Sequence, residues 1–514
     1  MAARAGDEPF LVEERIMQDM SETTGKTCAT KTCATKTCAT KTCASKTCAS
    51  KTWVLALTSV ASFMVALDAL VVTTALSTIR IDLGASIEAL EWTVNAYNLS
   101  FAVLLLTGAA LGDRLGRRRM FVAGLTLFVV ASAACALAGN IGALIAARAV
   151  QGAGAALVMP LAMALLSAAF PRGERAKALG IFSAATGLAL IAGPVAGGAI
   201  AEGFAWQWIF WINLPIGLIV IPLIRRHIRE SVGPGTGVDI VGLMLVTAAA
   251  MGVVWGLMRA NGAGWLSLEV VSALVMGIVL ATAFVVWELR AREPMVPMRL
   301  FRSRAFSSGL VASFMFYASM YGTLFLLPQF LQVAQGYGPF GAGLRLLPWT
   351  ATLFVFAPLG GSLVNRLGER LLVVVGLVLQ AIGMAWIALT ATPGLAYIDL
   401  VVPLILSGAG VSMAMPAAQN AVLGAVTPSE IGKASGTFNM ARFLGGVFGI
   451  TVQVAIFAAI GNFGSPQAFG VGFVAAMGAA AAMSLMAALA GLRLPGRRAV
   501  VLVSADATEP QTVS

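Results

Sequence analysis

Long apolar stretches separated by short polar segments dominate the sequence. After Trp53 we count fourteen blocks of about 20 or more mainly apolar residues, and each can cross the roughly 30 Å of hydrocarbon in a bilayer. Only 11% of the 514 residues are charged and 59% are hydrophobic, whereas an ordinary soluble domain has about 25% charged residues. The pattern excludes a soluble fold and predicts an all-α integral membrane protein with fourteen transmembrane helices.

The net charge of +11 does not indicate nucleic-acid binding, because the basic residues occur in short clusters between the apolar blocks. If the N-terminus is cytoplasmic, the clusters fall in the inner loops, and the outer loops contain only Arg80, Arg259 and Arg345. Since cytoplasmic loops are enriched in Lys and Arg, we expect both termini in the cytoplasm. The scarcity of Lys beside abundant Arg, Ala and Gly favours a bacterial source, and therefore the plasma membrane.

A five-residue KTCA[TS] repeat fills much of the polar segment 1–52 and contains five of the six cysteines. Five residues advance a helix by about 140° past whole turns, so these thiols would share no helix face. An acylated or metal-binding anchor is one alternative, but we expect a disordered cytoplasmic tail. Cys135 lies alone in an apolar block, so neither a disulfide framework nor a zinc site is indicated.

An internal repeat relates the two halves of the chain. The segment 111–118, LGDRLGRR, resembles LVNRLGER at 363–370, and two further matches, to the fourth and fifth blocks, recur at a similar offset. The offset covers eight blocks, so two parallel six-helix bundles are expected, with blocks seven and eight as an inserted helix pair. The predicted divisions are a tail at 1–52, an N-terminal bundle at 53–226, linker loops and the inserted pair at 227–304, a C-terminal bundle at 305–491 and a cytoplasmic tail at 492–514.

Asp68 lies in the first apolar block, with no charged residue between Lys51 and Arg80. An ionisable side chain at such depth is costly and by default functional, although it could instead mark the outer end of the span. Asp68 is therefore our candidate proton carrier. Arg148 lies in the fourth block, which runs in the opposite direction, and both side chains should lie roughly 10 Å below the outer face. We expect them to pair, with Gln151 one turn further on.

Two other segments carry motifs whose role would be structural or gating. One is the loop LGDRLGRRRM, for which an architectural role is favoured over a solvated turn because of its near-copy in the second half. The other is a Gly-Pro-rich segment of the fifth block, which permits close helix contact or a bend, with ordinary packing as the alternative. The candidate residues are Gly112, Asp113, Arg114, Gly116, Arg117, Arg118, Gly193, Pro194, Gly197 and Gly198.

Aromatic and polar side chains in several blocks suit a cavity for large, partly apolar ligands. The same side chains could instead pack between helices. The candidate substrate-binding residues are Trp92, Tyr97, Tyr317, Tyr321, Gln329, Asn439 and Arg442.

Taken together, these motifs resemble the major facilitator superfamily, specifically its fourteen-span drug:proton antiporters of the EmrB/QacA type. The matching segments are LDALVVTTAL, GDRLGRRRM, RAVQGAG, GPVAGG and WQWIFWINLPIG. The resemblance implies that Asp68 carries protons, that Arg148 sits in the proton path, and that Asp113 and the following arginines govern a cytoplasmic gate. It also implies that the Gly-Pro segment favours antiport. This chain has Thr73-Thr74 where the family usually has an Asn, which leaves the hydrogen bonding around Asp68 open.

We therefore predict a major facilitator fold and a proton-coupled antiporter that exports small amphipathic compounds, such as drugs, antibiotics or dyes, by alternating access. A facilitator-type importer and a non-transporting membrane sensor or scaffold are the alternatives. No GxxxxGK[ST] phosphate loop is present, so ATP hydrolysis has no support. We expect no enzyme activity, metal or cofactor. The expected partners are a small-molecule substrate, protons and the lipid bilayer, without nucleic acid, and the chain is expected to be a monomer.

Overall fold

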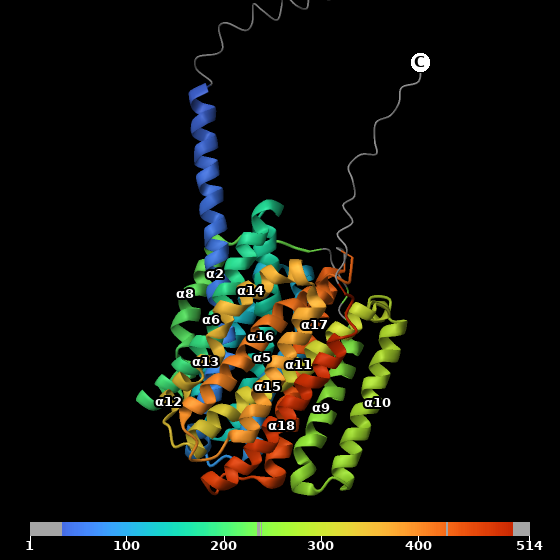
Figure 1. Ribbon diagram of the computed structural model, residues 1–514. Coiled ribbons are helices and arrows are strands. Elements are labelled where there is room, and N and C mark those ends of the chain that lie inside the picture. The colour runs from blue at the N-terminus through green and yellow to red at the C-terminus, as the bar shows by residue number, and fades with distance from the viewer. Residues whose placement is uncertain (1–32, 234–236, 238, 428–429, 497–514) are drawn as a thin grey trace, which may run out of the picture.

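The computed structural model describes residues 33–233, 237, 239–427 and 430–496, and all regular structure in these ranges is helical (Figure 1). Fourteen helical segments are long and apolar enough to cross a membrane, which confirms the predicted number of spans. The first eight spans are formed by α2 (Cys33–Asp82), α3 (Ile87–Leu115), α4 (Arg117–Ala136), α5 (Ile141–Ala169), α6 (Arg172–Gly203), α7 (Trp208–Trp211) with α8 (Asn213–His227), α9 (Ile240–Ala263) and α10 (Leu268–Arg290).

The remaining six spans follow a short 3-10 helix, η1 (Met298–Arg302). They are formed by α11 (Arg304–Gln329) with a π-helical turn η2 (Phe330–Ala334), by α12 (Pro339–Arg345), α13 (Leu347–Thr350) and α14 (Thr352–Leu367), and by α15 (Glu369–Thr390), α16 (Tyr397–Leu423), α17 (Ile431–Ile460) and α18 (Pro466–Gly491). The tenth span is thus broken into three helices, and a proline lies at the first position of α12 and at the second position of α13.

The internal repeat is visible in the structure as equivalent turns and equivalent helix contacts. Gly116 joins α3 to α4 with φ 108°, and Gly368 joins α14 to α15 with φ 82°. These left-handed conformations favour glycine. A Cβ on Gly154 of α5 would approach α4 at the Gly124 carbonyl, and a Cβ on Gly410 of α16 would approach α15 at the Gly376 carbonyl. The two halves therefore form related six-helix bundles.

The inserted pair, α9 and α10, lies at the edge of the molecule, and α10 packs mainly on α9 (Figure 1). Of the two, α9 contacts both bundles: Val254 and Met258 form a cluster with Leu99 of α3 and Val447 of α17. The pair therefore covers part of the seam between the two bundles.

The first helix starts earlier than expected. The tail was predicted to be disordered up to residue 52, but α2 begins at Cys33 and continues without a break into the first span. The segment from Cys33 to Thr52 contains neither Pro nor Gly, so nothing in it stops a helix from extending backwards from the span. Residues 1–32, including Cys28, lie outside the described part.

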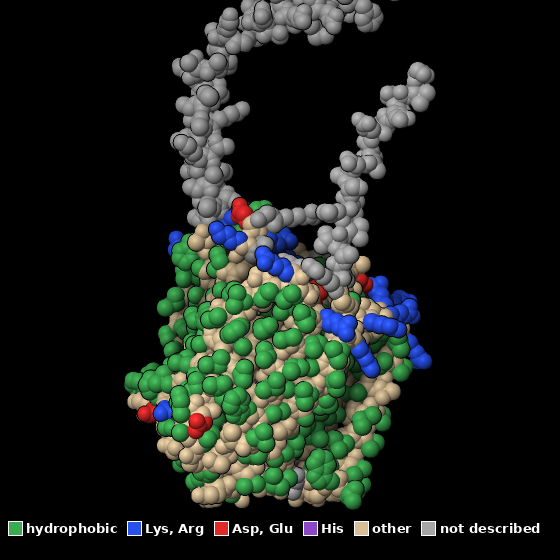
Figure 2. Space-filling view, viewed as in Figure 1, with side chains coloured by type: hydrophobic (Ala, Val, Ile, Leu, Met, Phe, Trp, Pro, Cys, Tyr) green, Lys and Arg blue, Asp and Glu red, His purple; other side chains and the backbone are tan. Residues whose placement is uncertain are grey.

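The basic residues gather at one end of the helical body, where α2 enters it, and an apolar flank runs away from them (Figure 2). The segment that follows α8 is fastened to this end. Glu230 accepts hydrogen bonds from the backbone N–H groups of Arg118 and Arg119 at 2.9 and 3.2 Å. The start of α4 is therefore held against the polypeptide that leads to the inserted pair.

Candidate functional site

Asp68 and Arg148 form a fully buried ion pair inside the N-terminal bundle. Asp68 of α2 is 1% exposed and Arg148 of α5 is 0% exposed. The Arg148 Nη1 atom donates to the Asp68 Oδ2 atom at 2.6 Å. The expected pairing of these two side chains is therefore present. A buried ion pair needs further hydrogen bonds to offset the loss of hydration, and the surrounding helices supply them.

The second carboxylate oxygen of Asp68 accepts from two amides. Gln151 Nε2 and Asn213 Nδ2 both donate to Asp68 Oδ1 at 2.9 Å. The same two amides reach the Ser132 hydroxyl of α4, at 2.9 and 2.8 Å. Asn213 begins α8, because the sixth span is interrupted between Trp211 and Asn213. Together the two amides satisfy the oxygen that the arginine leaves free.

Arg148 is positioned by α3 as well as by Asp68. Its Nε donates to the Thr93 carbonyl at 3.2 Å, and its guanidinium carbon lies 4.2 Å from the centre of the Tyr97 ring. The Tyr97 hydroxyl donates to the Val65 carbonyl of α2. Tyr97, predicted to bind substrate, therefore packs on the guanidinium of Arg148.

Thr73 and Thr74 do not take part in this network. The Thr73 hydroxyl donates to the Leu70 carbonyl at 2.7 Å, and the Thr74 hydroxyl donates to the Val71 carbonyl at 3.2 Å, both within α2. The hydrogen bonding that the sequence left open at Asp68 is supplied by Gln151 and Asn213. Of these two, only Gln151 was predicted beside the ion pair.

The Gly-Pro segment of α6 packs between α2 and α12. A Cβ on Gly193 would lie 2.7 Å from Leu70 Cβ, and one on Gly197 would meet the Val71 carbonyl of α2. A Cβ on Gly198 would meet the carbonyl oxygen of Pro339 at the start of α12. Conversely, Gly343 of α12 packs against the Pro194 carbonyl of α6. Glycine at these positions lets the helix that carries Asp68, α6 and the C-terminal bundle come into close contact.

The loop motif between α3 and α4 is held by the segment that follows α8. Arg117 Nε pairs with Asp113 Oδ1 at 2.7 Å, and the Asp113 carbonyl accepts from Gly233 N at 3.0 Å. A Cβ on Gly116 would contact the Glu230 carboxylate, and a Cβ on Gly112 would contact the Leu161 side chain of α5. Arg118 lies 3.6 Å from Glu230 through its Nε. Arg114 is exposed.

The candidate substrate residues do not form one cluster. Trp92 packs on Trp255 of the inserted pair with ring centres 6.3 Å apart. Gln329 is buried, and its Nε2 donates to the Phe325 carbonyl of its own helix. Asn439 likewise donates to the Ser435 carbonyl of α17. Tyr317, Tyr321 and Arg442 do lie together, in the C-terminal bundle.

Glu91 is a buried acid that the sequence interpretation missed. It is 1% exposed and lies in α3. Its Oε1 accepts from Asn95 Nδ2 at 3.0 Å, and Asn95 Nδ2 also lies 3.0 Å from the Thr451 hydroxyl of α17. The sequence signal was an acid one residue before Trp92, at the predicted start of the second block. Such a position is easily taken for the end of a span, but α3 already starts at Ile87.

Comparisons with known proteins agree with this architecture. The Major Facilitator Superfamily profile matches residues 58–450. The chain is 34% identical over 404 residues to the multidrug resistance protein Stp of Mycobacterium tuberculosis, covering 78% of this chain and 75% of that protein. It is also 34% identical over 404 residues to the tetracenomycin C resistance and export protein of Streptomyces glaucescens, with 78% and 74% covered. It is 31% identical over 408 residues to the multidrug transporter protein MdtP of Bacillus subtilis, with 77% and 73% covered.

Solved structures with the same fold are more distant in sequence. A D-xylose-proton symporter superposes with a TM-score of 0.62 at 15% identity, covering 87% of this chain and 98% of the symporter. A peptide transporter of the POT type in complex with sulfate gives a TM-score of 0.61 at 17% identity, covering 86% and 93%. With its fourteen spans and its two related bundles, the chain belongs to the Major Facilitator Superfamily of non-enzymatic membrane transporters.

Proposed function

We propose that this transporter exports small amphipathic compounds, such as drugs, antibiotics or dyes, in exchange for protons, with Asp68 as the proton carrier. The named relatives support the export of antibiotics and other drugs. The observation that carries the proton step is the buried Asp68, whose two oxygens are held by Arg148, Gln151 and Asn213. A carboxylate in this position can bind a proton only if the contact with its cation loosens, so protonation and a rearrangement of these helices are coupled.

The packing of α6 supports a route from this site to alternating access. The Gly193–Gly198 segment contacts α2 within two turns of Asp68 on one face and α12 of the other bundle on a neighbouring face. A shift of α2 on protonation would therefore act on the contact between the bundles. Rocking of two bundles around a central site is the usual mode of transport in proteins built from such repeats.

We further propose that both termini are cytoplasmic and that the arginine-rich end faces the cytoplasm of a bacterial plasma membrane. The clustering of Lys and Arg at one end supports this orientation (Figure 2). The loop containing Asp113 would lie at this end and act as the gate, held by the segment 228–233. Because both bundles and Asp68 belong to one chain, a monomer suffices for the cycle.

The test uses purified protein in proteoliposomes loaded with a pH-sensitive dye. Asp68→Asn keeps the volume and removes the proton, so uphill export should stop while exchange of labelled substrate across the membrane continues. Asp68→Glu should retain part of the coupled export. Asp399→Asn is the matched control, because Asp399 is an exposed acid in the first turn of α16. Full gradient-driven export by Asp68→Asn would disprove the assignment, accumulation against the opposite gradient would indicate an importer, and no transport by the unmodified protein would favour a sensor.

A further inference from the structure

Arg442 is a half-buried charged residue near the middle of α17, and it has no acidic partner among the described residues. It lies eleven residues after the start of α17, which is roughly 16 Å along a helix of 30 residues. Its guanidinium carbon lies 4.9 Å from the centre of the Tyr317 ring and 5.3 Å from that of Phe443. Its Nε atom is buried without a hydrogen-bond partner. Within the described residues, no carboxylate comes within ion-pair distance of it.

The C-terminal bundle offers no acid that could neutralise this charge. In the described helices from α11 to α18 the acidic residues are Glu369 and Asp399, and each lies in the first turn of its helix, next to a loop. Arg148 differs in this respect, because Asp68 compensates its charge at 2.6 Å. A guanidinium without an acidic partner is expensive to keep at membrane depth, and such residues mark substrate or ion pathways.

The two buried acids of the N-terminal bundle, Asp68 and Glu91, are already engaged elsewhere. Asp68 is held by three donors of its own bundle. Glu91 lies beside Asn95, which contacts Thr451 of α17. Thr451 is about 13 Å further along α17 than Arg442. Neither acid is therefore placed to serve as the partner of Arg442.

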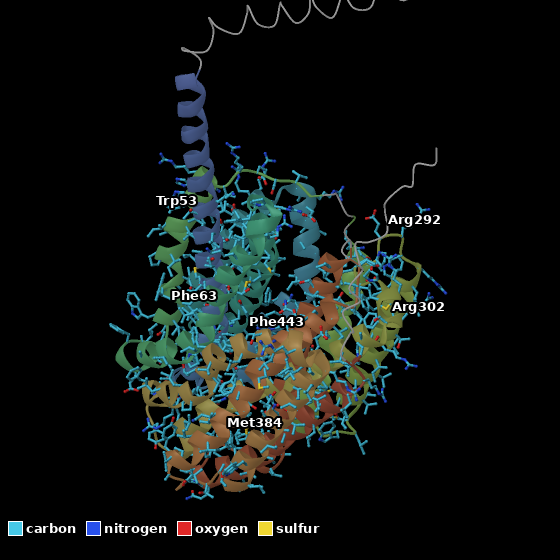
Figure 3. The ribbon with its side chains drawn as sticks, turned by 45° about the horizontal axis from the view of Figure 1, so that its top comes forward. Trp53, Phe63, Arg292, Arg302, Met384 and Phe443 are labelled. Atoms are coloured by element: carbon cyan, nitrogen blue, oxygen red, sulfur yellow. The ribbon has the colours of Figure 1, made fainter. Side chains whose placement is uncertain are left out.

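A series of contacting aromatic rings connects Arg148 with Arg442 across the boundary between the bundles. Tyr97 contacts Phe101 with ring centres 6.2 Å apart, and Phe101 of α3 meets Phe443 of α17 edge-on at 4.2 Å. Tyr321 follows at 6.2 Å from Phe443 and Tyr317 at 6.3 Å from Tyr321. Phe443 lies near the middle of the molecule in the view of Figure 3. Flat aromatic ligands stack on such rings.

We propose that Arg442, with Tyr317 and Tyr321, forms an anion-binding subsite that selects flat aromatic compounds carrying a carboxylate or phenolate. This substrate class rests on the proposed export function. The guanidinium would bind the anionic group through charge-assisted hydrogen bonds, with its open Nε as one donor. The neighbouring rings would hold the apolar part. The same charge would repel cationic dyes, because no interior acid of this bundle offsets it.

The test compares two dyes that share a xanthene ring system and differ in charge, the anion fluorescein and the cation rhodamine 123. Binding to purified protein in detergent is measured by fluorescence anisotropy at mildly alkaline pH. Fluorescein should bind and rhodamine 123 should not. Arg442→Gln should weaken fluorescein binding by about tenfold or more, and Arg442→Lys should retain part of the affinity because it keeps the charge. Retention of affinity by the Lys variant also shows that the site is folded.

Arg345→Gln is the matched control. Arg345 also stacks on a tyrosine, with its guanidinium carbon 3.4 Å from the centre of the Tyr337 ring, but it lies in α12, far along the chain from Arg442. This variant should bind fluorescein like the unmodified protein. Equal binding of both dyes, no binding of fluorescein, or an unchanged affinity in Arg442→Gln would each overturn the proposal. The assay uses no proton gradient, so a failure of proton coupling would leave its result intact.

Discussion

At the scale of single residues, the buried charge of Asp68 is distributed over groups from several helices. Arg148 comes from α5, Asn213 from α8 and the supporting Ser132 from α4. An arrangement of this kind is sensitive to the loss of one partner, because the remaining charge stays buried without compensation. Removing both charges together is much less costly than removing one.

We expect Arg148→Gln to lower the free energy of unfolding by about 3–5 kcal/mol, since it leaves Asp68 unpaired in the interior. The double variant Asp68→Asn with Arg148→Gln should recover most of this loss. Unfolding by SDS titration in mixed micelles measures both. If the double variant is no more stable than Arg148→Gln alone, the ion pair does not determine the stability of this site.

A second residue-scale prediction concerns the contact between the bundles at Thr451. Thr451→Val removes the hydroxyl that lies 3.0 Å from Asn95 Nδ2 and should cost about 0.6 kcal/mol, a common value for such bonds in membrane proteins. Thr437→Val is the control, because the Thr437 hydroxyl donates to the Lys433 carbonyl within α17. A double-mutant cycle that combines Thr451→Val with Asn95→Ala isolates the interaction between these two side chains. A coupling free energy of zero would contradict a contribution of this hydrogen bond to the stability of the protein.

The sequence predicted the Asp68–Arg148 contact because the depth of each side chain in its span can be counted. It could not predict the part played by Asn213 and Ser132, since their contact with Asp68 depends on the rotation of α8 and α4 about their axes. Arg442 was expected to line a pocket, but only the structure shows that no acid of the described residues lies within ion-pair distance of it.

At the scale of helices, the contact between α6 and α12 depends on the absence of a side chain. We predict that Gly198→Ala is destabilising and slows transport, because its Cβ would meet the Pro339 carbonyl and would lie 2.8 Å from Phe340 Cα. Gly187→Ala is the control in the same helix, since its nearest neighbour is Leu353 Cδ2 at 3.7 Å. The control should gain up to about 1 kcal/mol from helix propensity.

Thermal unfolding in detergent and dye efflux from vesicles measure the two effects of these α6 variants. If Gly198→Ala is as stable and as active as Gly187→Ala, the close approach of α6 and α12 is not required for the cycle.

At the scale of helices, the sequence predicts the turns that the two halves share but not the breaks within spans. The repeat predicted equivalent turns after α3 and α14, and Gly116 and Gly368 both adopt positive φ there. The breaks in the sixth and tenth spans were not predicted. Hydropathy records how many apolar residues follow one another, and it does not record where the backbone leaves the helix to pack against a neighbour.

At the scale of the whole molecule, the orientation in the membrane follows from where the arginines lie. Val232 lies at the arginine-rich end and is 64% exposed, and Leu266 lies in the turn between α9 and α10 and is 94% exposed. If the arginine-rich end is cytoplasmic, these two positions face opposite sides of the membrane. They therefore test both the orientation and the count of spans between them.

The experiment introduces Val232→Cys or Leu266→Cys into a chain whose six native cysteines have been replaced. A membrane-impermeant maleimide added to intact cells should label only the cysteine at position 266, and added to everted vesicles it should label only the one at position 232. One membrane span separates the two sites, so an error in the span count would bring both to the same side. Labelling of position 232 from outside would reverse the orientation and place Asp68 nearer the cytoplasm. Labelling of both positions from one side would contradict α9 as a span.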